Sequence, residues 1–374
     1  MAVCFVREAA VTASGRGITE VVVGPVHAGI IEPGRFRIGT NGETIASFEM
    51  QFGFAHRGVE TALIGRDAVG AAPAIARICG GCTAARSWAY ARALEDLAGV
   101  CVDERSELAR LLFAELERIY NHIFDLGAAC AGAGYGYGRT AALGLVERVH
   151  RVCARLSGHR FLFDAIVPGG VRGEAFEGGA AVIAELETIR GDLERLVHDV
   201  LANDSVRRRF EGAGILSARS VRELGGVGPA RRACGDPLDA RIENPYGAYA
   251  RIMPFIATQS GGDVAARFRV KTQELRESLR LASCALEHLG GAKLPAPQKP
   301  EVGAGSTTGI AEGARGVETM RVRTGARGAL QSVSIISASA RNWPLVARAM
   351  EGNIVPDFPL VNKSFNLCYA CMDK

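Results

Sequence analysis

Hydrophobic and polar positions divide the chain into a strand-rich beginning, a helical middle and a second strand-rich stretch near the end. β-Branched residues fill positions 19–23, and apolar and polar residues alternate over 35–38. Such patterns are typical of strands. Asn41-Gly42 follows and predicts a type I′ hairpin turn that leads into a further strand over 43–48.

The middle of the chain shows the helical spacing of apolar residues. The helices are predicted over 86–97, 103–130, 180–203 and 263–289. The second of these carries acids in its first turn, as the helix dipole favours. Strands return over 317–324 and 330–336, predicted as a hairpin. Glycine and proline mark loops at 132–138 and 290–300.

These elements predict an α+β protein that is predominantly α-helical: a helical bundle with small β-elements from the N- and C-terminal segments. We expect one domain over 1–374. Its parts are an N-terminal β-region of about 1–55, a helical core of about 57–290, and a C-terminal β-region and tail of about 300–374. Since no run approaches 18 apolar residues, the sequence predicts no membrane span.

Charge and cysteine usage narrow the class of protein further. The net charge of +4 is too small to predict binding to nucleic acid or lipid. No secretory signal opens the chain, so we expect the reducing cytoplasm. Six of the ten cysteines are scattered without regular spacing, and we expect them to be inert core residues. They are Cys4, Cys101, Cys130, Cys153, Cys234 and Cys284.

The other four cysteines form two C-x-x-C pairs, Cys79 with Cys82 and Cys368 with Cys371, and 285 residues separate the pairs. A zinc ribbon sets its pairs about 15–20 residues apart. These pairs instead predict a buried site where two distant segments meet. Thiolates are soft ligands. Spacing alone leaves a structural zinc site or a [4Fe–4S] cluster open.

Motifs over about 20–371 resemble the large, catalytic subunit of group 4, energy-converting [NiFe] hydrogenases, of the formate hydrogenlyase and CO-linked type. They also resemble the homologous 49-kDa-type subunit of respiratory complex I. The resemblance rests on Gly24-Pro25-Val26-His27, His56-Arg57-Gly58-Val59-Glu60, Arg77-Ile78-Cys79-Gly80-Gly81-Cys82, Tyr120-Asn121-His122, Pro168-Gly169-Gly170-Val171-Arg172, Gly228-Pro229-Ala230-Arg231, Glu312-Gly313-Ala314-Arg315-Gly316 and Asp357-Phe358-Pro359-Leu360.

The resemblance implies a Ni-Fe(CN)2(CO) centre. Cys79, Cys82, Cys368 and Cys371 would bind nickel, and Cys82 and Cys371 would also bind the iron that carries the CN and CO ligands. The complex I branch lacks both thiolate pairs and binds quinone instead, so the cysteines favour the hydrogenase branch. Sulfur donors suit soft, redox-active metals.

The resemblance also implies two catalytic residues. Glu60 would relay protons beside a nickel thiolate, a role that suits a carboxylate whose pKa burial raises. The alternative is an ion pair with Arg57 or Arg66. Arg315 would hold its guanidinium over the open metal position, where base behaviour would need strong perturbation. The alternative is a salt bridge with Glu312 or Glu318.

Three histidines also stand in the motifs. His27 and His56 match positions near the quinone cavity of the complex I branch, although lone histidines are more often structural. His122 and Asp125 share a helix face, which would also suit two ligands of a metal site. An interhelical hydrogen bond is the favoured interpretation, because no second acidic helix motif accompanies them.

Two residues near the cysteines depart from the family pattern. Arg86 stands where the family has a histidine, and Asn366 where it has an aspartate. We expect both in the surroundings of the metals, where they would make the site more positive. The alternative is that they point away from the metals and pair with surface acids. The chain shown ends at Lys374, three residues beyond Cys371. Relatives lose a tail at this point, so the sequence is either the processed form or comes from a gene without a tail.

The implied function is reversible reduction of protons to H2, with electrons from a small subunit that bears a [4Fe–4S] cluster. Further partners would be a 30-kDa-like complex I-type subunit, membrane-arm subunits and maturation factors. The complex would lie at the cytoplasmic face of the inner membrane. The alternatives are a quinone-linked electron-transfer subunit and a degenerate scaffold subunit that holds zinc or nothing.

Overall fold

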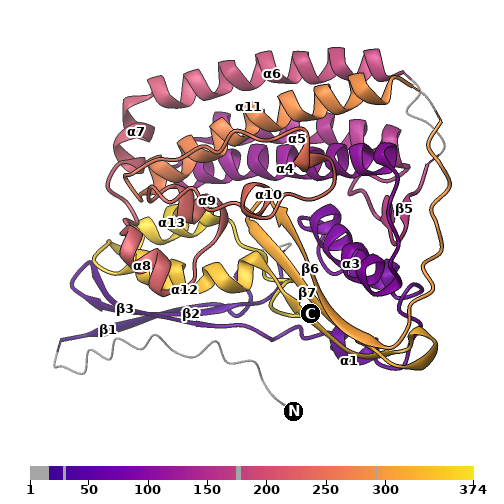
Figure 1. Cartoon of the computed structure of the whole chain (residues 1–374). Coiled ribbons are helices and arrows are strands. Elements are labelled where there is room, and N and C mark those ends of the chain that lie inside the picture. Colours follow the sequence, from indigo (N-terminus) through magenta and orange to yellow (C-terminus); the bar gives the residue numbers. More distant parts are fainter. Residues whose placement is uncertain (1–16, 28–30, 174–177, 292) are drawn as a thin grey trace.

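Long helices form the upper layers of the molecule, and two small antiparallel sheets lie beneath them (Figure 1). The computed structural model describes residues 17–27, 31–173, 178–291 and 293–374. The long helices of the upper layers are α4 (Glu104–Gly132), α5 (Gly136–Ser157), α6 (Gly179–Ala202) and α11 (Val264–Leu289). A further long helix, α3 (Thr83–Ala98), lies lower, beside one of the sheets. This arrangement confirms the predicted α+β, predominantly helical class.

The first sheet has the order β1 (Thr19–Val23), β2 (Arg35–Asn41), β3 (Thr44–Gln51), and its strands lie where the sequence predicted them. The type I′ turn is wrong. Asn41 pairs with Thr44, so Gly42 and Glu43 form the loop, and only Gly42 has a positive φ, of 59°. A type I′ turn needs positive φ at both central residues.

The second sheet has the order β6 (Gly305–Gly313), β7 (Gly316–Thr324), β8 (Leu330–Ile336). The β7–β8 hairpin was predicted and is confirmed, whereas β6 was missed. Position 309 of that strand requires glycine, because a Cβ there would lie 1.9 Å from the carbonyl oxygen of Ala89. Strand β6 therefore packs directly on the backbone of α3, the helix that follows the first cysteine pair.

Caps fix the ends of the predicted helices. Asp103 accepts hydrogen bonds from the amides of Arg105 and Ser106 at the start of α4, and Asp263 caps α11 in the same way. Gly290 ends α11 at a φ of 55°. The loop predicted over 132–138 is mostly wrong, since α4 runs to Gly132 and α5 begins at Gly136.

Shorter elements connect these layers. They are α1 (Val59–Ala62), α2 (Ala72–Ala76), β4 (Ile166–Val167), β5 (Gly170–Val171), α7 (Asp204–Phe210), α8 (Ala218–Glu223), α9 (Gly228–Arg232), α10 (Ala240–Glu243), η1 (Gly247–Ala250), η2 (Ala326–Gly328), α12 (Ala338–Met350), η3 (Val355–Asp357) and α13 (Phe358–Phe365). Helices α12 and α13 lead the chain back to the first cysteine pair.

The scattered cysteines only partly match the expectation of a core role. Cys130, Cys153 and Cys234 are buried, as expected, but Cys101 is exposed and Cys284 is only half-buried. The core prediction is therefore wrong for these two, which lie on a loop and on α11, respectively. Cys4 lies outside the described residues.

Candidate metal centre

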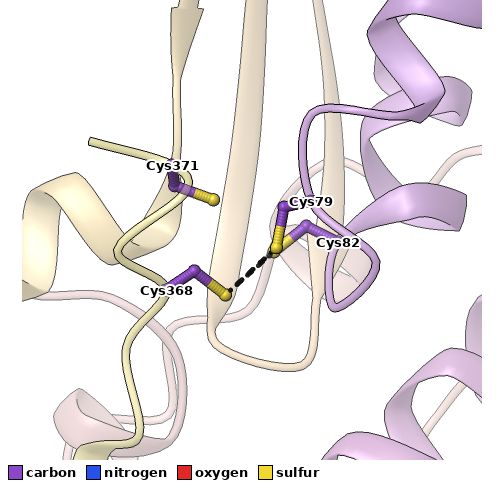
Figure 2. Close-up of side chains that lie close together, drawn as sticks. All are labelled: Cys79, Cys82, Cys368 and Cys371. Atoms are coloured by element: carbon purple, nitrogen blue, oxygen red, sulfur yellow. Dashed lines mark hydrogen bonds between the residues drawn. The ribbon is translucent and has the colours of Figure 1, made fainter. Parts of the chain in front are cut away.

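The two cysteine pairs meet, as the sequence predicted (Figure 2). Cys79 and Cys82 lie in the turn between α2 and α3, and Cys368 and Cys371 lie beyond α13. The Sγ atom of Cys368 is 3.3 Å from that of Cys79 and 3.9 Å from that of Cys82. All four sulfurs lie within 4.8 Å of one another.

The size and chemistry of this cluster fit a metal centre. Two sulfurs that each lie about 2.3 Å from one metal ion can be at most about 4.6 Å apart. The four sulfurs lie within 4.8 Å of one another, which is close to this limit. Cys82 and Cys371 are buried, and Cys79 and Cys368 are half-buried. Four soft donors in a largely enclosed position suit nickel, iron or zinc.

One face of α4 holds the first cysteine pair. Glu117 accepts hydrogen bonds from the amides of Ala84 and Ala85, at 2.5 and 3.1 Å, and so caps the start of α3. Tyr120 donates to the Gly80 carbonyl at 2.7 Å, and Asn121 donates to the Gly81 carbonyl at 2.9 Å. These contacts fix the turn that carries Cys79 and Cys82.

Arg57 joins the two cysteine segments. Its Nη2 atom donates to the carbonyl of Ile78, next to Cys79, at 2.9 Å, and to that of Ala370, next to Cys371, at 2.8 Å. The backbone amide of Arg57 also donates to the carbonyl of Asp373. The arginine of the H-R-G-x-E motif thus connects the segments that bring the four thiols together.

Arg315 lies beside the thiols on the turn between β6 and β7. Its guanidinium donates to the Asn366 carbonyl at 2.5 Å and to Asn121 Oδ1 at 2.8 Å, and lies 3.5 Å from Asp125 Oδ1. Burial opposes its charge, but Cys368 and Asp125 raise the pKa of Arg315 well above its usual value. It is therefore a permanent cation.

The carboxylate partner of Arg315 differs from both alternatives that the sequence offered. It is Asp125, whereas Glu318 pairs with Arg86 and Glu312 pairs with Arg232. In the sequence, Asp125 stands out only as a neighbour of His122 on one helix face. Its place one helical turn beyond Asn121 on α4 is the signal that connects it to the site.

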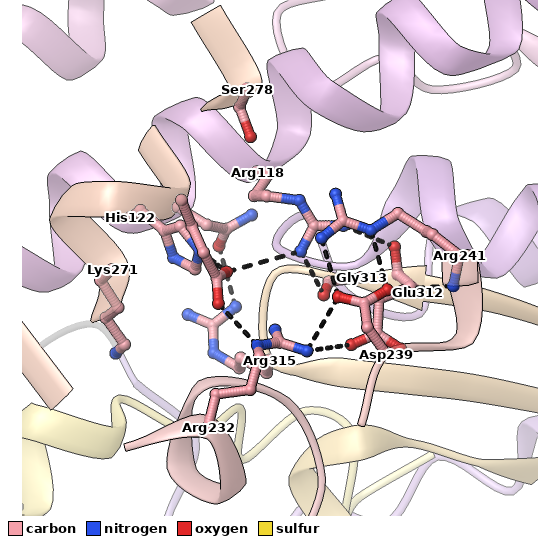
Figure 3. A network of polar contacts seen from close by, with 12 residues as sticks. Arg118, His122, Arg232, Asp239, Arg241, Lys271, Ser278, Glu312, Gly313 and Arg315 are labelled. Carbon is pink, nitrogen blue, oxygen red and sulfur yellow. Dashed lines mark hydrogen bonds and ion pairs between the residues drawn. The ribbon is translucent and has the colours of Figure 1, made fainter. Parts of the chain in front are cut away.

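A buried network of charges supports the turn that carries Arg315 (Figure 3). Arg118 donates to the carbonyls of Glu312 and Gly313, at 2.9 Å each. The network behind it consists of Glu115, Arg232, Asp239, Arg241 and Glu274. His122 shares a 2.8 Å hydrogen bond with Glu274 of α11, which confirms the interhelical interpretation.

Arg86 contacts a thiol directly. Its Nη2 atom donates to Cys371 Sγ at 3.1 Å and to Glu318 Oε2 at 2.9 Å. Hydrogen bonds from Cys368, Cys79 and Cys82, and the charge of Arg86, hold the pKa of Cys371 well below its usual value. The expectation that Arg86 makes the site more positive is corrected, because Glu318 pairs with it.

Asn366 ends α13 in the left-handed region, at a φ of 52°. Its side-chain amide donates to Asp125 Oδ1 at 2.5 Å, and its carbonyl accepts from Arg315. Asp125 also forms a 2.6 Å ion pair with Lys271. The carboxylate that the sequence pattern lacks at position 366 is thus supplied by α4.

Glu60 lies on α1, and its contacts are with the C-terminal segments. Its Oε1 atom accepts from the amide of Ile335 at 2.7 Å and lies 2.9 Å from Lys374 Nζ. The ion pair is therefore with Lys374 rather than with Arg57 or Arg66. Since Lys374 follows Cys371 by three residues, Glu60 is tied to the second cysteine segment. Its catalytic role stays a prediction.

The two remaining histidines do not contact the thiols directly. His27 packs against the rings of Phe36 and Tyr369, with centroids 5.4 and 5.8 Å away. Burial lowers the pKa of His27, and its Nε2 atom has no hydrogen-bond partner among the described residues. His56 is exposed. Their match to positions near the quinone cavity of the complex I branch stays a prediction.

Comparison with known proteins extends this picture. Residues 57–126 match the family described as nickel-dependent hydrogenase, and residues 140–299 match the 49-kDa subunit of respiratory-chain NADH dehydrogenase. An NADH-quinone oxidoreductase subunit of Dehalococcoides mccartyi (strain ATCC BAA-2266 / KCTC 15142 / 195) is 30% identical over 300 residues, which cover 79% of this chain and 81% of that protein. The chain belongs to this family of complex I 49-kDa subunits and related hydrogenase large subunits.

Relatives named as hydrogenases match more of the chain. Formate hydrogenlyase subunit 5 of Escherichia coli is 29% identical over 95% of this chain. The membrane-bound hydrogenase subunit alpha of Pyrococcus furiosus is also 29% identical over 95% of this chain, and 87% of that protein is covered. The chain spans 63% of the formate hydrogenlyase subunit and 61% of hydrogenase-4 component G.

A solved structure shares the fold. A chain of the membrane-bound sulfane sulfur reductase, an archaeal respiratory membrane complex, superimposes with a TM-score of 0.89 at 24% identity. The match covers 96% of this chain and 99% of that one. The Pyrococcus furiosus relative is named as membrane-bound, and the solved structure is that of a membrane complex. Over the described residues, no helix here is long and apolar enough to cross a membrane.

Proposed function

We propose that this chain is the catalytic large subunit of a membrane-associated, energy-converting [NiFe] hydrogenase. The reaction would be 2H⁺ + 2e⁻ ⇌ H2. One observation carries the proposal: two cysteine pairs from opposite ends of the chain bring four sulfurs within 4.8 Å. The names of the relatives support it, since they include formate hydrogenlyase subunit 5 and a CO-induced hydrogenase.

The thiols would hold a Ni-Fe(CN)2(CO) centre. Cys79, Cys82, Cys368 and Cys371 are the nickel ligands in this proposal, with Cys82 and Cys371 shared with iron. When bound, the centre supplies the redox chemistry of proton reduction. The protein holds the thiols in place through the contacts of α4 and Arg57, and Arg86 stabilises the thiolate of Cys371.

Proton movement would use Glu60. Its carboxylate is half-buried and lies between the Ile335 amide and Lys374, on the segment that follows Cys371. One oxygen is held by these partners, which orients the carboxyl group for proton transfer. Arg315 would act through its fixed charge rather than as a base, because Asn121 and Asp125 hold it and its pKa is raised.

Electrons would come from a partner. The described cysteines outside the site are dispersed, so we propose a small subunit with a [4Fe–4S] cluster as the electron donor. A 30-kDa-like subunit, membrane-arm subunits and maturation factors complete the proposed set. Through them the chain would lie at the cytoplasmic face of the inner membrane.

The test is hydrogen turnover by the purified complex. We expect H2 uptake with a viologen acceptor and exchange between D2 and solvent protons, both lost in Cys371→Ser. Cys234→Ser, at a buried cysteine outside the site, is the matched control and should retain both activities. A metal-loaded complex that shows neither activity would contradict the proposal.

The second candidate is a quinone-linked electron-transfer subunit. The observation that favours it is the 30% identity to the NADH-quinone oxidoreductase subunit of Dehalococcoides mccartyi. Quinone reduction by the complex that persists in Cys79→Ser and Cys371→Ser would select this function, because it would not need the thiols.

A further inference from the structure

A small cavity lies beside Arg315, on the side where α11 and α13 meet. Its volume is ≈ 10 Å³, about the room that one water-sized ligand needs. Three cations line it, Arg267, Lys271 and Arg315, together with apolar side chains that include Ala230 and Phe365. Lys271 and Arg315 are visible in Figure 3.

The cavity is strongly positive. The three cations are 1%, 4% and 7% exposed, respectively, so all are shielded from water. One carboxylate, Asp125, is the ion-pair partner of both Lys271 and Arg315, at 2.6 and 3.5 Å. Among the described residues, no carboxylate lies within 4.0 Å of Arg267. A buried charge without a counter-ion is costly.

The other groups that face Arg267 do not remove this imbalance. It donates to Ser364 Oγ and to the carbonyls of Gly262 and Gly214, at 2.8 to 3.0 Å, and its guanidinium lies 4.2 Å from the Phe365 ring centroid. These partners are neutral. Burial lowers the pKa of Arg267 to about 10, although the charges of Cys234 and Asp263 oppose this shift.

The two guanidinium groups that line the cavity also have N–H groups without a hydrogen bond to the described residues. A guanidinium has five N–H groups. Arg267 and Arg315 each use three in hydrogen bonds to described residues, which leaves two on each. Buried donors require acceptors. Arg267 and Arg315 both line the cavity, so an acceptor bound there would lie beside both residues.

We propose that this cavity binds one small monovalent anion, of about the size of chloride, between the guanidinium groups of Arg267 and Arg315. Lys271 also lines the cavity and contributes only its charge, because its three N–H groups already donate to Asp125 and to the carbonyls of Ser364 and Phe365. The anion balances the buried charge of α11 and accepts the unused N–H groups. The site is distinct from the thiols, because Arg267 and Lys271 contact none of them. Its existence does not depend on hydrogenase activity.

Diffraction with bromide tests the site in the unaltered full chain. Crystals grown in sodium bromide should give an anomalous peak inside the cavity. Crystals grown in sodium gluconate, whose anion is too large to enter, should show no more than water density there. A bromide data set in which the cavity holds only water, or in which anomalous peaks lie only elsewhere, would overturn the proposal.

Thermal unfolding gives a second readout. At equal ionic strength, chloride should raise the Tm of the full chain over gluconate in a saturable manner. Arg267→Gln should abolish this difference. Arg269→Gln, two residues away on the exposed side of the same helix, should preserve it. Equal Tm values in chloride and gluconate for the unaltered chain would contradict the proposal, whether or not Arg267→Gln folds.

Discussion

Arg86 Nη2 donates a hydrogen bond to the Sγ atom of Cys371 at 3.1 Å. The same guanidinium is held by Glu318, at 2.9 and 3.1 Å, and both side chains are almost fully buried. The Cys371 thiolate therefore has the guanidinium of Arg86 beside it, and Glu318 balances the charge of that guanidinium. This relationship replaces the simpler expectation that Arg86 adds an uncompensated positive charge to the site.

Replacing one partner of the Arg86–Glu318 pair should destabilise the fold more than replacing both. Arg86→Met leaves Glu318 buried without its partner and should cost about 3–5 kcal/mol in the free energy of unfolding. The double variant Arg86→Met with Glu318→Gln should recover most of that loss. Urea unfolding of the four chains in a double-mutant cycle measures this. Purely additive losses would mean that the two residues do not interact as described.

The bridge made by Arg57 should control metal retention. Arg57→Met removes the donors to the Ile78 and Ala370 carbonyls and should lower metal affinity about 10–100-fold, as loss of supporting contacts around ligands typically does. Chelator competition measures the affinity. Arg219→Met, at an exposed arginine on α8, is the control. Equal affinities in the two variants would show that the bridge is dispensable.

Two glutamates on α4 should give opposite pH effects. Burial raises the pKa of Glu117 to about 7, from 4.5. The native state therefore keeps a proton that the unfolded chain releases, so its stabilising effect is full below pH 4.5 and is lost as the pH rises through about 7. Burial also opposes ionisation of Glu115, but Arg118 and Arg241 lower its pKa. Its contribution is present above pH 4.5 and is lost on acidification.

Glutamine substitution separates these effects. Relative to the unaltered chain, Glu117→Gln should gain stability between pH 5 and 7, by up to about 1.4 kcal/mol per pH unit, and Glu115→Gln should be most destabilising at neutral pH. Denaturant unfolding at pH 5, 6, 7 and 8 measures both. The same pH dependence in the two variants would contradict the assignment.

Glu60 should matter for turnover rather than for assembly. Glu60→Gln keeps an oxygen that can accept from the Ile335 amide but cannot carry a proton. We expect H2 turnover to fall at least about 100-fold, the lower range for general acid–base catalysis, with unchanged metal content. Glu20→Gln, on the exposed strand β1, is the control. Full activity in Glu60→Gln would remove this residue from the proposed proton route.

Local patterns made most of the fold predictable. The helix over 103–130 has a capping aspartate and a long apolar face, so both its type and its start were predicted. Strand β6 was missed because four of its nine residues are glycine or alanine, which weakens the alternation. Helix α5 was missed because its first turn contains two glycines, and packing against α4 compensates for their poor helix propensity.

Only the site residues that lie in recognisable motifs could be predicted from the sequence. The four cysteines, Glu60 and Arg315 all lie in recognisable segments. Their partners do not: Glu318 reaches Arg86 from a neighbouring strand, and Lys271 reaches Asp125 from a helix 146 residues away in sequence. Such pairs depend on tertiary packing, which leaves no fixed spacing in the sequence. Glu117 was missed for the same reason.

The metal content of the purified complex tests the central claim most directly. We predict one nickel and one iron at the four thiols, in addition to the iron of the [4Fe–4S] cluster in the small subunit. Infrared bands from CN and CO should be present, and nickel should be lost in each of the four variants Cys79→Ser, Cys82→Ser, Cys368→Ser and Cys371→Ser. The protein should be produced with its own maturation factors. Stoichiometric zinc without nickel in that material would contradict the account and would make the four thiols a structural site.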